Sequence, residues 1–398
     1  MLNDISGGPR LSSMRRLRHA IVGAGVIGRH HAKVVGGLEE YELVAVADVV
    51  EEKARSLAER YGARAYTDYV EMFEKEELDT VSVCTPHPLH AEVAVAAAKH
   101  GVNVLTEKPM AATVSQCLEM IWEARRRGVK LGVVFQYRFE PHFRRAKRLI
   151  SSGGLGEPYR ALLRYVTYRD MAYYGSAEWR GRWASEGGGV LINQAVHLID
   201  AFTWLMGMMP VEVFAYAGTV GHDIEVEDLV SAVALYANGC QAAMQFSTLD
   251  TPDMVHVEIR GDRGVLLVET SPKRGEEGLK SVVGRYLYLN ETPIRRAIFA
   301  SLKGGGRPGY RIEEVRVDEP FTGHRAVLED FAKAVLEDRE PEVPGEEGVK
   351  SVELINAMIM SAVKGQPVKI PISPAEYDRL LEELKALGKP PWRAPLAR

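Results

Sequence analysis

The sequence predicts an α/β protein: an N-terminal Rossmann domain with a doubly wound parallel sheet, then a C-terminal α/β domain with a large, mostly antiparallel open sheet. Three observations support this prediction. Short apolar runs alternate with helical patterns between residues 19 and 137, a glycine-rich turn follows the first run, and longer alternating strands follow one another beyond residue 137. Parallel strands buried on both faces are continuously apolar, whereas consecutive alternating strands with short turns are typical of antiparallel sheets.

The first half contains five apolar runs that we expect to be strands, at residues 20–25, 42–48, 80–86, 103–109 and 130–136. Helical patterns lie between them, at residues 26–38, 51–62, 88–101 and 113–128. Several of these patterns end in Gly after a basic residue, which is the usual signal of a helix C-terminus. Repeated alternation of strand and helix predicts a parallel sheet.

In the second half we expect strands at residues 158–169, 211–220, 228–237, 240–249, 255–261 and 264–270. The turns ANGC and GDRG are short enough to join antiparallel neighbours. We expect helices at residues 187–200, 323–338 and 346–364. The division is therefore a flexible lead-in (1–18), a dinucleotide-binding domain (19–137), a substrate-binding and oligomerisation domain (138–372), and a C-terminal helix and tail (373–398).

Composition excludes several classes of protein. Of the 398 residues, 46% are hydrophobic and 26% are charged, which is typical of a globular chain. The net charge of −4 gives no general footprint for nucleic acid. No apolar run approaches the roughly 20 residues that span a bilayer. The first 19 residues lack the apolar segment of a secretory signal, and the three cysteines suit a reducing compartment, so we expect a cytoplasmic protein.

The glycine-rich turn predicts a dinucleotide site. Gly23, Gly25 and Gly28 form G-x-G-x-x-G, with Val26 and Ile27 opening the helix, and Asp48 ends the next strand 20 residues after Gly28. In such turns the helix N-terminus faces the pyrophosphate and the acidic residue accepts hydrogen bonds from the ribose. Val49 and Val50 follow Asp48 in place of a basic residue, so NAD is favoured over NADP.

Two further segments carry residues that could do chemistry. Lys108, in Glu107-Lys108-Pro109, ends a predicted strand, and ligands bind outside the carboxyl ends of parallel strands. A strand-end lysine alone could equally be a solvated surface charge. In GGGVLINQAVHLID a continuous helix would place Asn193, His197 and Asp200 on one face. Taken alone, His197 could be a buried structural histidine.

The combination of AIVGAGVIGRHHA, DTVSVCTPHPLHAEVAVAAAKHGVNVLTEKPMA and GGGVLINQAVHLID resembles the Gfo/Idh/MocA oxidoreductases, a family named for glucose–fructose oxidoreductase and inositol 2-dehydrogenase. The resemblance continues through HRAVLEDFAKAVLEDREPEVPGEEGVKSVELINAMIMSAV and covers residues 19 to 372. It implies a Rossmann domain plus a C-terminal domain whose open sheet mediates homodimers or homotetramers. It also implies that Lys108 and His197 are catalytic, with Lys108 before a cis proline at Pro109.

The resemblance extends to other positions. It implies that cofactor contacts come from Thr85 and Pro86, with His90 at a helix start more often structural, and from the segments around Glu107 and Gln136. It implies that Arg138 and Arg180 lie near cofactor or substrate. The expected set is therefore, for the cofactor, Gly23, Gly25, Val26, Ile27, Gly28, Asp48, Thr85, Pro86, His90, Glu107, Lys108 and Gln136, and, for the substrate, Asn193, Arg138, Arg180 and Tyr168.

One departure concerns the substrate. Many polyol dehydrogenases of the family carry Asp four residues before the histidine, where this chain has Asn193. Asn there is similar to members that act on nucleotide-linked or acidic sugars. The segment 165–183 is rich in Tyr, Trp and Arg, which suits a sugar with an anionic group, although an aromatic packing loop is an equal alternative.

The expected function is hydride transfer between NAD and a secondary hydroxyl or ketone of a sugar, sugar derivative or cyclic polyol. His197 would accept the hydroxyl proton and Lys108 would polarise the oxygen, although the reverse assignment stays open. Asp200 would either orient His197 or make a structural contact. The histidines, including His30 and His31, show no metal-like spacing. Alternatives are an NAD-dependent glycosidase and a non-catalytic sugar or nucleotide sensor.

Overall fold

The computed structural model describes residues 15–270, 282–289, 292–300, 302, 309–316 and 323–392. Most of the predicted lead-in and the last six residues of the predicted tail lie outside these ranges. None of the described helices is both long enough and apolar enough to cross a membrane.

The first sheet has six parallel strands in the order β3-β2-β1-β4-β5-β6. The strands are β1 (Leu17–Val22), β2 (Tyr41–Ala47), β3 (Arg64–Tyr66), β4 (Thr80–Val83), β5 (Asn103–Thr106) and β6 (Leu131–Val133). This is the strand order of a dinucleotide-binding Rossmann fold, so the predicted fold class is confirmed. The first strand begins at Leu17, two residues before the predicted start of the domain. The strand β3 was not predicted, because its three residues lack an apolar run.

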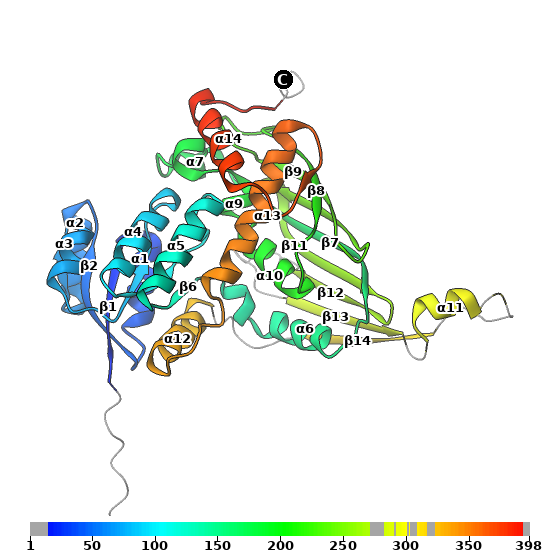
Figure 1. Ribbon diagram of the computed structural model, residues 1–398, viewed down its shortest axis with the longest axis horizontal. Coiled ribbons are helices and arrows are strands. Elements are labelled where there is room, and N and C mark those ends of the chain that lie inside the picture. Colours follow the sequence, from blue (N-terminus) through cyan, green and yellow to red (C-terminus); the bar gives the residue numbers. More distant parts are fainter. Residues whose placement is uncertain are drawn as a thin grey trace, which may run out of the picture.

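Helices cover both faces of this sheet (Figure 1). They are α1 (Val26–Val35), α2 (Glu51–Tyr61), α3 (Tyr69–Lys75), α4 (His90–Lys99) and α5 (Val114–Arg127). The helices α2 and α5 both end at a left-handed glycine, Gly62 and Gly128 respectively, as their sequence pattern predicts. The helix α5 begins with a capping box in which Thr113 and Gln116 bond each other's backbone.

The second sheet has nine strands in the order β14-β13-β12-β11-β7-β10-β9-β8-β15. They are β7 (Pro158–Tyr168), β8 (Glu212–Gly218), β9 (Leu229–Leu235), β10 (Gln241–Ser247), β11 (Leu249–Gly261), β12 (Gly264–Thr270), β13 (Val282–Leu289), β14 (Tyr310–Arg316) and β15 (Val368–Lys369). Only the β7–β10 pair is parallel among these described strands. The mostly antiparallel open sheet is therefore confirmed, and it gains β13, β14 and β15, which were not predicted.

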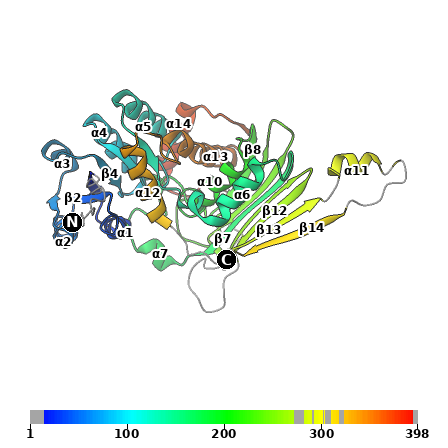
Figure 2. The same cartoon turned by 90° about the horizontal axis from the view of Figure 1, so that it is seen from below.

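One face of this second sheet is covered by α6 (Pro141–Ser151), α10 (Val196–Met206) and α13 (Gly345–Lys364), as Figures 1 and 2 show. The strand β9 alternates exposed and buried residues along its whole length. Its buried residues face the helices, so its exposed ones lie on the uncovered face. The remaining helices are the short α7 (Met171–Gly175), α8 (Trp183–Glu186) and α9 (Val190–Asn193), then α11 (Ile294–Ala300), α12 (Gly323–Leu336) and α14 (Pro374–Leu387).

The chain passes between the two domains more than once. It enters the second at the 3₁₀ turn η2 (Gln136–Phe139), and α12 then returns to pack against this turn and against α1 of the first domain. The Tyr41 hydroxyl, in β2, donates a 2.9 Å hydrogen bond to the carbonyl of Leu328 in α12. A β-bridge joins Gly132 of β6 to Pro344. Part of the predicted second domain is therefore built into the first.

Candidate active site

The cofactor turn is shaped by what its three glycines touch. Gly23 has φ of +99°, and a Cβ there would lie 2.5 Å from the carbonyl oxygen of Cys84. A Cβ on Gly28 would lie 1.8 Å from the carbonyl oxygen of Gly23. Gly25 differs, because a Cβ there would meet nothing within 4 Å. Two glycines thus allow the turn to close, and the third leaves open space at the N-terminus of α1, where a pyrophosphate binds.

Asp48 is tied to the same turn. Its carboxylate accepts hydrogen bonds from the backbone N–H groups of Ala24, at 2.8 Å, and Val50, at 2.9 Å. Each of its oxygens keeps a further lone pair. Val26, which opens α1 beside the turn, is 81% exposed. This geometry fits an adenosine ribose on Asp48.

Thr85 and Gln136 lie beyond the carboxyl ends of β4 and β6. The Thr85 Oγ1 and Gln136 Oε1 atoms are both buried and have no hydrogen-bond partner among the described residues. Buried polar atoms without partners usually mark places that a ligand or water fills. Together with the open space at Gly25, they show that the residues present fit a nicotinamide dinucleotide laid across the sheet edge.

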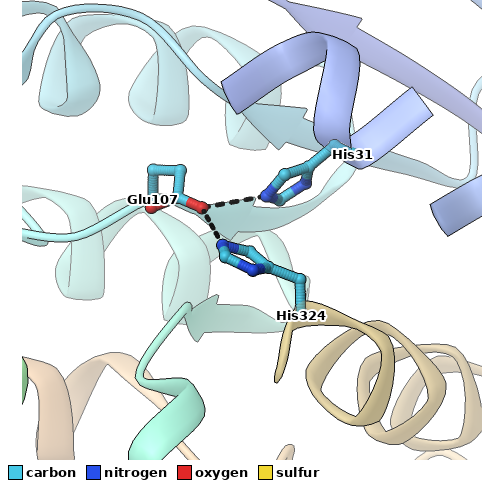
Figure 3. Close-up of side chains that lie close together, drawn as sticks. All are labelled: His31, Glu107 and His324. Atoms are coloured by element: carbon cyan, nitrogen blue, oxygen red, sulfur yellow. Dashed lines mark hydrogen bonds and ion pairs between the residues drawn. The ribbon is translucent and has the colours of Figure 1, made fainter. Parts of the chain in front are cut away.

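Two of the predicted cofactor contacts are corrected by the structure. The buried His90 ring places its nitrogens 2.7 Å from the Pro109 carbonyl oxygen and 2.9 Å from that of Thr85. It therefore holds the two strand ends together and has no nitrogen left for a cofactor. Glu107 is 4% exposed and points at His31 and His324 (Figure 3).

Glu107, His31 and His324 form the group in the described part of the chain whose ligand atoms lie close enough to share a metal ion. Their spacing along the chain does not indicate this group, because His324 comes from α12, far from the other two residues. Glu107 Oε1 lies 2.9 Å from His31 Nε2 and 3.2 Å from His324 Nε2. Each pair is at hydrogen-bonding distance without an ion.

Lys108 projects from the end of β5 into the space between the domains. Its peptide bond to Pro109 is cis, as the resemblance implied. Its Nζ donates a 2.9 Å hydrogen bond to the backbone carbonyl of Asn193, on the second domain. Burial lowers the pKa of Lys108; Arg180 and Arg169 lower it further, while Glu107 and Glu186 oppose this. Lys108 is thus a partly buried side chain bonded across the domains, not a solvated surface charge.

The predicted helix at residues 187–200 is wrong in one respect. The segment forms two helices, α9 and α10, with a break at residues 194–195. A Cβ on Gly189 would lie 2.0 Å from the Glu227 carbonyl oxygen, and the Glu227 carboxylate accepts the N–H of Gly189 at 2.8 Å. On either side of the break the side chains have different partners: Asn193 bonds Glu186 and Tyr173, whereas the His197 ring stacks on Tyr137. Asn193, His197 and Asp200 therefore do not share one face.

His197, in the first turn of α10, faces the other domain. Its ring stacks on Tyr137, with centroids 5.4 Å apart, and its Nδ1 is buried without a described partner. Burial holds the pKa of His197 well below its ordinary value, and the nearby charge of Lys108 lowers it further. The ring is therefore neutral, and its Nδ1 has no hydrogen-bond partner among the described residues.

Asp200 and Arg138 form a structural pair, each 1% exposed. Asp200 accepts two hydrogen bonds from the Arg138 guanidinium, at 2.7 and 2.8 Å, and Glu347 accepts a third at 3.2 Å. This settles the open alternative for Asp200 in favour of a structural contact. Arg138, predicted to lie near cofactor or substrate, thus directs three of its five N–H donors to carboxylates of the protein.

The aromatic segment 165–183 does reach the site, but through a different tyrosine. Tyr168 is 55% exposed at the end of β7, and the hydroxyl among the polar groups belongs to Tyr173. That hydroxyl bonds Asn193 at 3.3 Å, Gln194 at 3.0 Å, and Arg180. The Arg180 guanidinium lies between the Tyr173 and Trp179 rings, 4.2 and 4.4 Å from their centroids.

Glu186 was not singled out from the sequence. It is 1% exposed, and its carboxylate accepts hydrogen bonds from the Asn193 side chain and from the backbone N–H of Gly181. Burial raises the pKa of Glu186 to about 7, against the effect of these bonds. Asn193 is therefore held between Glu186 and Tyr173. The only available signal was an acidic residue directly before three glycines, and this gives no information on its partner.

Known proteins are similar to this chain over both domains. The family described as "Oxidoreductase family, NAD-binding Rossmann fold" matches residues 17–135, and the "GFO/IDH/MocA C-terminal domain" matches residues 143–267. Inositol 2-dehydrogenase of Rhizobium meliloti is 28% identical over 365 residues, which is 89% of this chain and 99% of that protein. D-glucoside 3-dehydrogenase of Escherichia coli is 35% identical over 201 residues, 49% of this chain and 56% of that protein.

Solved structures show the same likeness. The WlbA dehydrogenase from Bordetella pertussis, in complex with NADH and UDP-GlcNAcA, has a TM-score of 0.75 and 27% identity, covering 90% of this chain and 100% of that one. Aldose-aldose oxidoreductase from Caulobacter crescentus, complexed with glycerol, has a TM-score of 0.71 and 28% identity, covering 89% of this chain and 100% of that one.

The matched segments coincide with the structural units described above. Residues 17–135 contain β1 to β6, and residues 143–267 contain most of α6 and reach into β12. The glycine turn, Asp48 and the orphaned Thr85 and Gln136 atoms make the first unit a site for NAD. The chain therefore belongs to the Gfo/Idh/MocA family of NAD-dependent oxidoreductases.

Proposed function

We propose that this enzyme transfers a hydride between NAD and a secondary hydroxyl or ketone of a sugar derivative or cyclic polyol. The observation that carries the proposal is the approach of a lysine from one domain to the helix start that carries a neutral histidine on the other. Lys108 Nζ, from β5, lies 2.9 Å from the carbonyl of Asn193, one turn ahead of the neutral His197 ring. The relatives named inositol 2-dehydrogenase and D-glucoside 3-dehydrogenase support this class of substrate.

The proton chemistry follows from the two side chains. Oxidation of an alcohol needs a base for the hydroxyl proton and a positive group near the oxygen. We assign the proton to His197, because its low pKa keeps the ring neutral, and its buried Nδ1 has no partner in the described protein. Lys108, as an ammonium, donates a hydrogen bond to the substrate oxygen. The hydride from the adjacent carbon would go to NAD, the chemistry that this cofactor supplies when bound.

We infer that NAD is preferred to NADP. Asp48 already has its backbone N–H bonds, so a 2′-phosphate would bring a second negative charge against an anchored carboxylate. The side chains that would hold NAD are Asp48, Thr85 and Gln136, with the turn from Gly23 to Gly28.

For the substrate we propose a sugar that carries an anionic group. The Nε atoms of Arg169 and Arg180 are buried without a described partner, and the charges of both residues act on Lys108. Guanidinium groups with spare donors suit a carboxylate or phosphate. The WlbA dehydrogenase structure, which contains UDP-GlcNAcA, is consistent with such a ligand. Asn193, fixed by Tyr173, would bond a ring hydroxyl.

We also propose a homodimer or homotetramer formed through the open sheet face. The face uncovered by helices carries exposed apolar side chains, among them Val233 at 54%, Leu235 at 40% and Leu229 at 38% exposure. A row of this kind is unusual on a monomer surface. A cytoplasmic location is proposed because Cys84, Cys117 and Cys240 are free thiols.

The test is a substrate panel followed by NADH absorbance. It compares neutral polyols, uronic acids and nucleotide-linked uronic acids on wild type, Lys108→Ala and His197→Ala. We expect turnover of the acidic sugars, and a loss of about 10²–10⁴-fold in each variant. Undiminished turnover in both variants would remove the assignment. Release of a free sugar without net NADH would identify a glycosidase, and NAD binding without any turnover would identify a sensor.

A further inference from the structure

Glu107 is the central acceptor of a buried hydrogen-bonded cluster with His31 and His324. The three side chains come from β5, α1 and α12 and point toward one another (Figure 3). A carboxylate can only accept, so both histidines donate from Nε2 to Glu107 Oε1, at 2.9 Å for His31 and 3.2 Å for His324. The second oxygen, Oε2, accepts the backbone N–H of Lys108 at 3.1 Å.

A second series of hydrogen bonds, on the other side of the His31 ring, determines which of its nitrogens donates. Its Nδ1 lies 2.9 Å from Ser82 Oγ, which also lies 3.0 Å from His19 Nε2, and His19 Nδ1 lies 2.8 Å from Thr80 Oγ1. With Nε2 of His31 protonated, Ser82 donates to His31, His19 donates to Ser82, and Thr80 donates to His19. Burial lowers the pKa of His19 to about 3, so the series Ser82, His19 and Thr80, called here the arm behind His31, stays neutral. The arm ends inside the sheet and orients His31 toward Glu107.

The charge of the carboxylate is preserved and acts on the reacting groups. Burial alone would raise the pKa of Glu107, but the bonds from His31 and His324 hold it well below its ordinary value. The negative charge raises the pKa of both Lys108 and His197 against the larger lowering effect of burial. One anchored anion therefore acts on both groups that exchange the substrate proton.

We propose that Glu107, held by His31 and His324, is a positioning residue of the reaction: it fixes the strand end that carries Lys108 and places a permanent negative charge behind Lys108 and His197. The inference rests on the proposed function and goes beyond it, because it gives a role to a carboxylate whose two oxygens are already bonded to His31, His324 and the backbone N–H of Lys108. The charge stabilises whichever of the two groups holds the extra proton during turnover, so it makes both better proton acceptors.

The effect has to be separated from those of the other groups around the carboxylate. The titratable or charged side chains that act on Glu107, or on which it acts, come from α1, β4, α4, β5, α10 and α12: they are His30, His31, Cys84, His90, Lys108, His197 and His324. Of these, only Lys108 and His197 face the proposed substrate, so the pH profile of turnover reports on them.

The decisive variant is Glu107→Gln, which keeps an oxygen for the two histidines and removes the charge. We expect kcat for alcohol oxidation to fall about tenfold or more with KM for the sugar little changed. We also expect the acidic limb of the kcat–pH profile to move about one unit lower, because the bases lose an attracting charge. An unmoved limb would overturn the proposal, even if kcat fell.

Two further variants separate positioning from mere stability. Ser82→Ala cuts the arm behind His31 but keeps the Glu107 charge, so it should lower the melting temperature and leave the acidic limb in place. His324→Leu removes one donor and should move the limb in the direction of Glu107→Gln, and His324→Gln, which restores a donor, should recover part of the shift. Equal limb shifts in Ser82→Ala and Glu107→Gln would contradict the proposal.

The competing use of this cluster is a metal site. Metal analysis of the purified wild type and titration with Zn²⁺ decide between the two uses. One equivalent of tightly held metal, lost in His324→Leu, would overturn the positioning role; its absence supports it. The proposed function fails separately: it falls if Lys108→Ala and His197→Ala keep full turnover, whatever Glu107→Gln does.

Discussion

The two walls of the active site are built in different ways. The wall on the first domain is formed by the backbone: Gly23 and Gly28 allow a tight turn, and Asp48 accepts hydrogen bonds from main-chain N–H groups. The wall on the second domain is a matter of side chains, with Asn193 held between Glu186 and Tyr173. The first side of the site depends on backbone conformation, which a contiguous sequence motif determines. The second side depends on side chains from segments that only folding brings together. Substitutions should therefore break the two walls by different routes.

The largest loss of stability is expected at the buried Arg138–Asp200 pair, which lies in the second domain behind the side chains of the site. Asp200→Ala leaves the buried Arg138 guanidinium with Glu347 alone, so the free energy of unfolding should fall by about 3–5 kcal/mol. Urea denaturation measures this loss. The double variant Arg138→Met with Asp200→Ala should recover a large part of it, because it removes the unpaired charge. A double variant as unstable as Asp200→Ala would contradict the ion-pair explanation.

The next effect concerns pH and the anchor of the second wall. Burial raises the pKa of Glu227 from 4.5 to about 7. Since the pKa is higher in the folded state, the contribution of this carboxyl to stability is fully present below pH 4.5 and is lost as the pH rises through 7. The stability of wild type relative to Glu227→Gln should therefore fall by roughly 3 kcal/mol between pH 4.5 and pH 8. Parallel stability curves for the two proteins would count against the shift.

A pair of glycine variants tests the first wall. Gly28→Ala forces a Cβ against the Gly23 carbonyl and should lower the free energy of unfolding by about 1–3 kcal/mol. Gly25→Ala has open space and φ of −69°, so its melting temperature should stay close to wild type. NADH titration should nevertheless show weaker binding in Gly25→Ala, because the methyl group enters the pyrophosphate space. Equal melting temperatures for the two variants would refute the distinction.

The smallest effect is expected from one hydroxyl of the second wall. Tyr173→Phe removes the oxygen that bonds Asn193, Gln194 and Arg180, while it keeps the ring on which Arg180 stacks. KM for the sugar should rise about fivefold, with a smaller change in kcat, because one hydrogen-bonding centre is worth about 1 kcal/mol. Steady-state kinetics measure both constants. Tyr168→Phe is the matched control, since that side chain is largely exposed, and an equal effect there would point to the wrong tyrosine.

The sequence was a good guide where the determinants are local. Continuous apolar runs and helix-ending glycines predicted most strands and helices, and G-x-G-x-x-G with Asp48 predicted the strand–turn–helix that forms the NAD site. Short elements such as β3 and β15, with three and two residues, have too little periodicity to be recognised. The break between α9 and α10 was missed because no Gly or Pro marks it, and Glu227, which holds the start of α9, lies 38 residues away from Gly189.

Side-chain partners were less predictable for the same reason. Asp200 and Arg138 are 62 residues apart, so the sequence left Asp200 open between His197 and a structural contact, and assigned Arg138 to the substrate. His31 and His324 meet on Glu107 only because α12 returns to the first domain. A motif can identify a residue that is chemically competent, but only the folded arrangement shows whether its hydrogen bonds are already used.

The return of α12 has a consequence for how this enzyme can be divided. A Cβ on Gly132, in β6, would lie 3.0 Å from the Phe331 side chain. The backbone N–H of Val133 donates a 3.0 Å hydrogen bond to the carbonyl of Val343. A fragment cut after residue 137 would therefore expose an apolar flank of its last strand. The nucleotide-binding half is not a module that can be transplanted alone. Recombination with a relative would have to exchange residues 323–364 together with it.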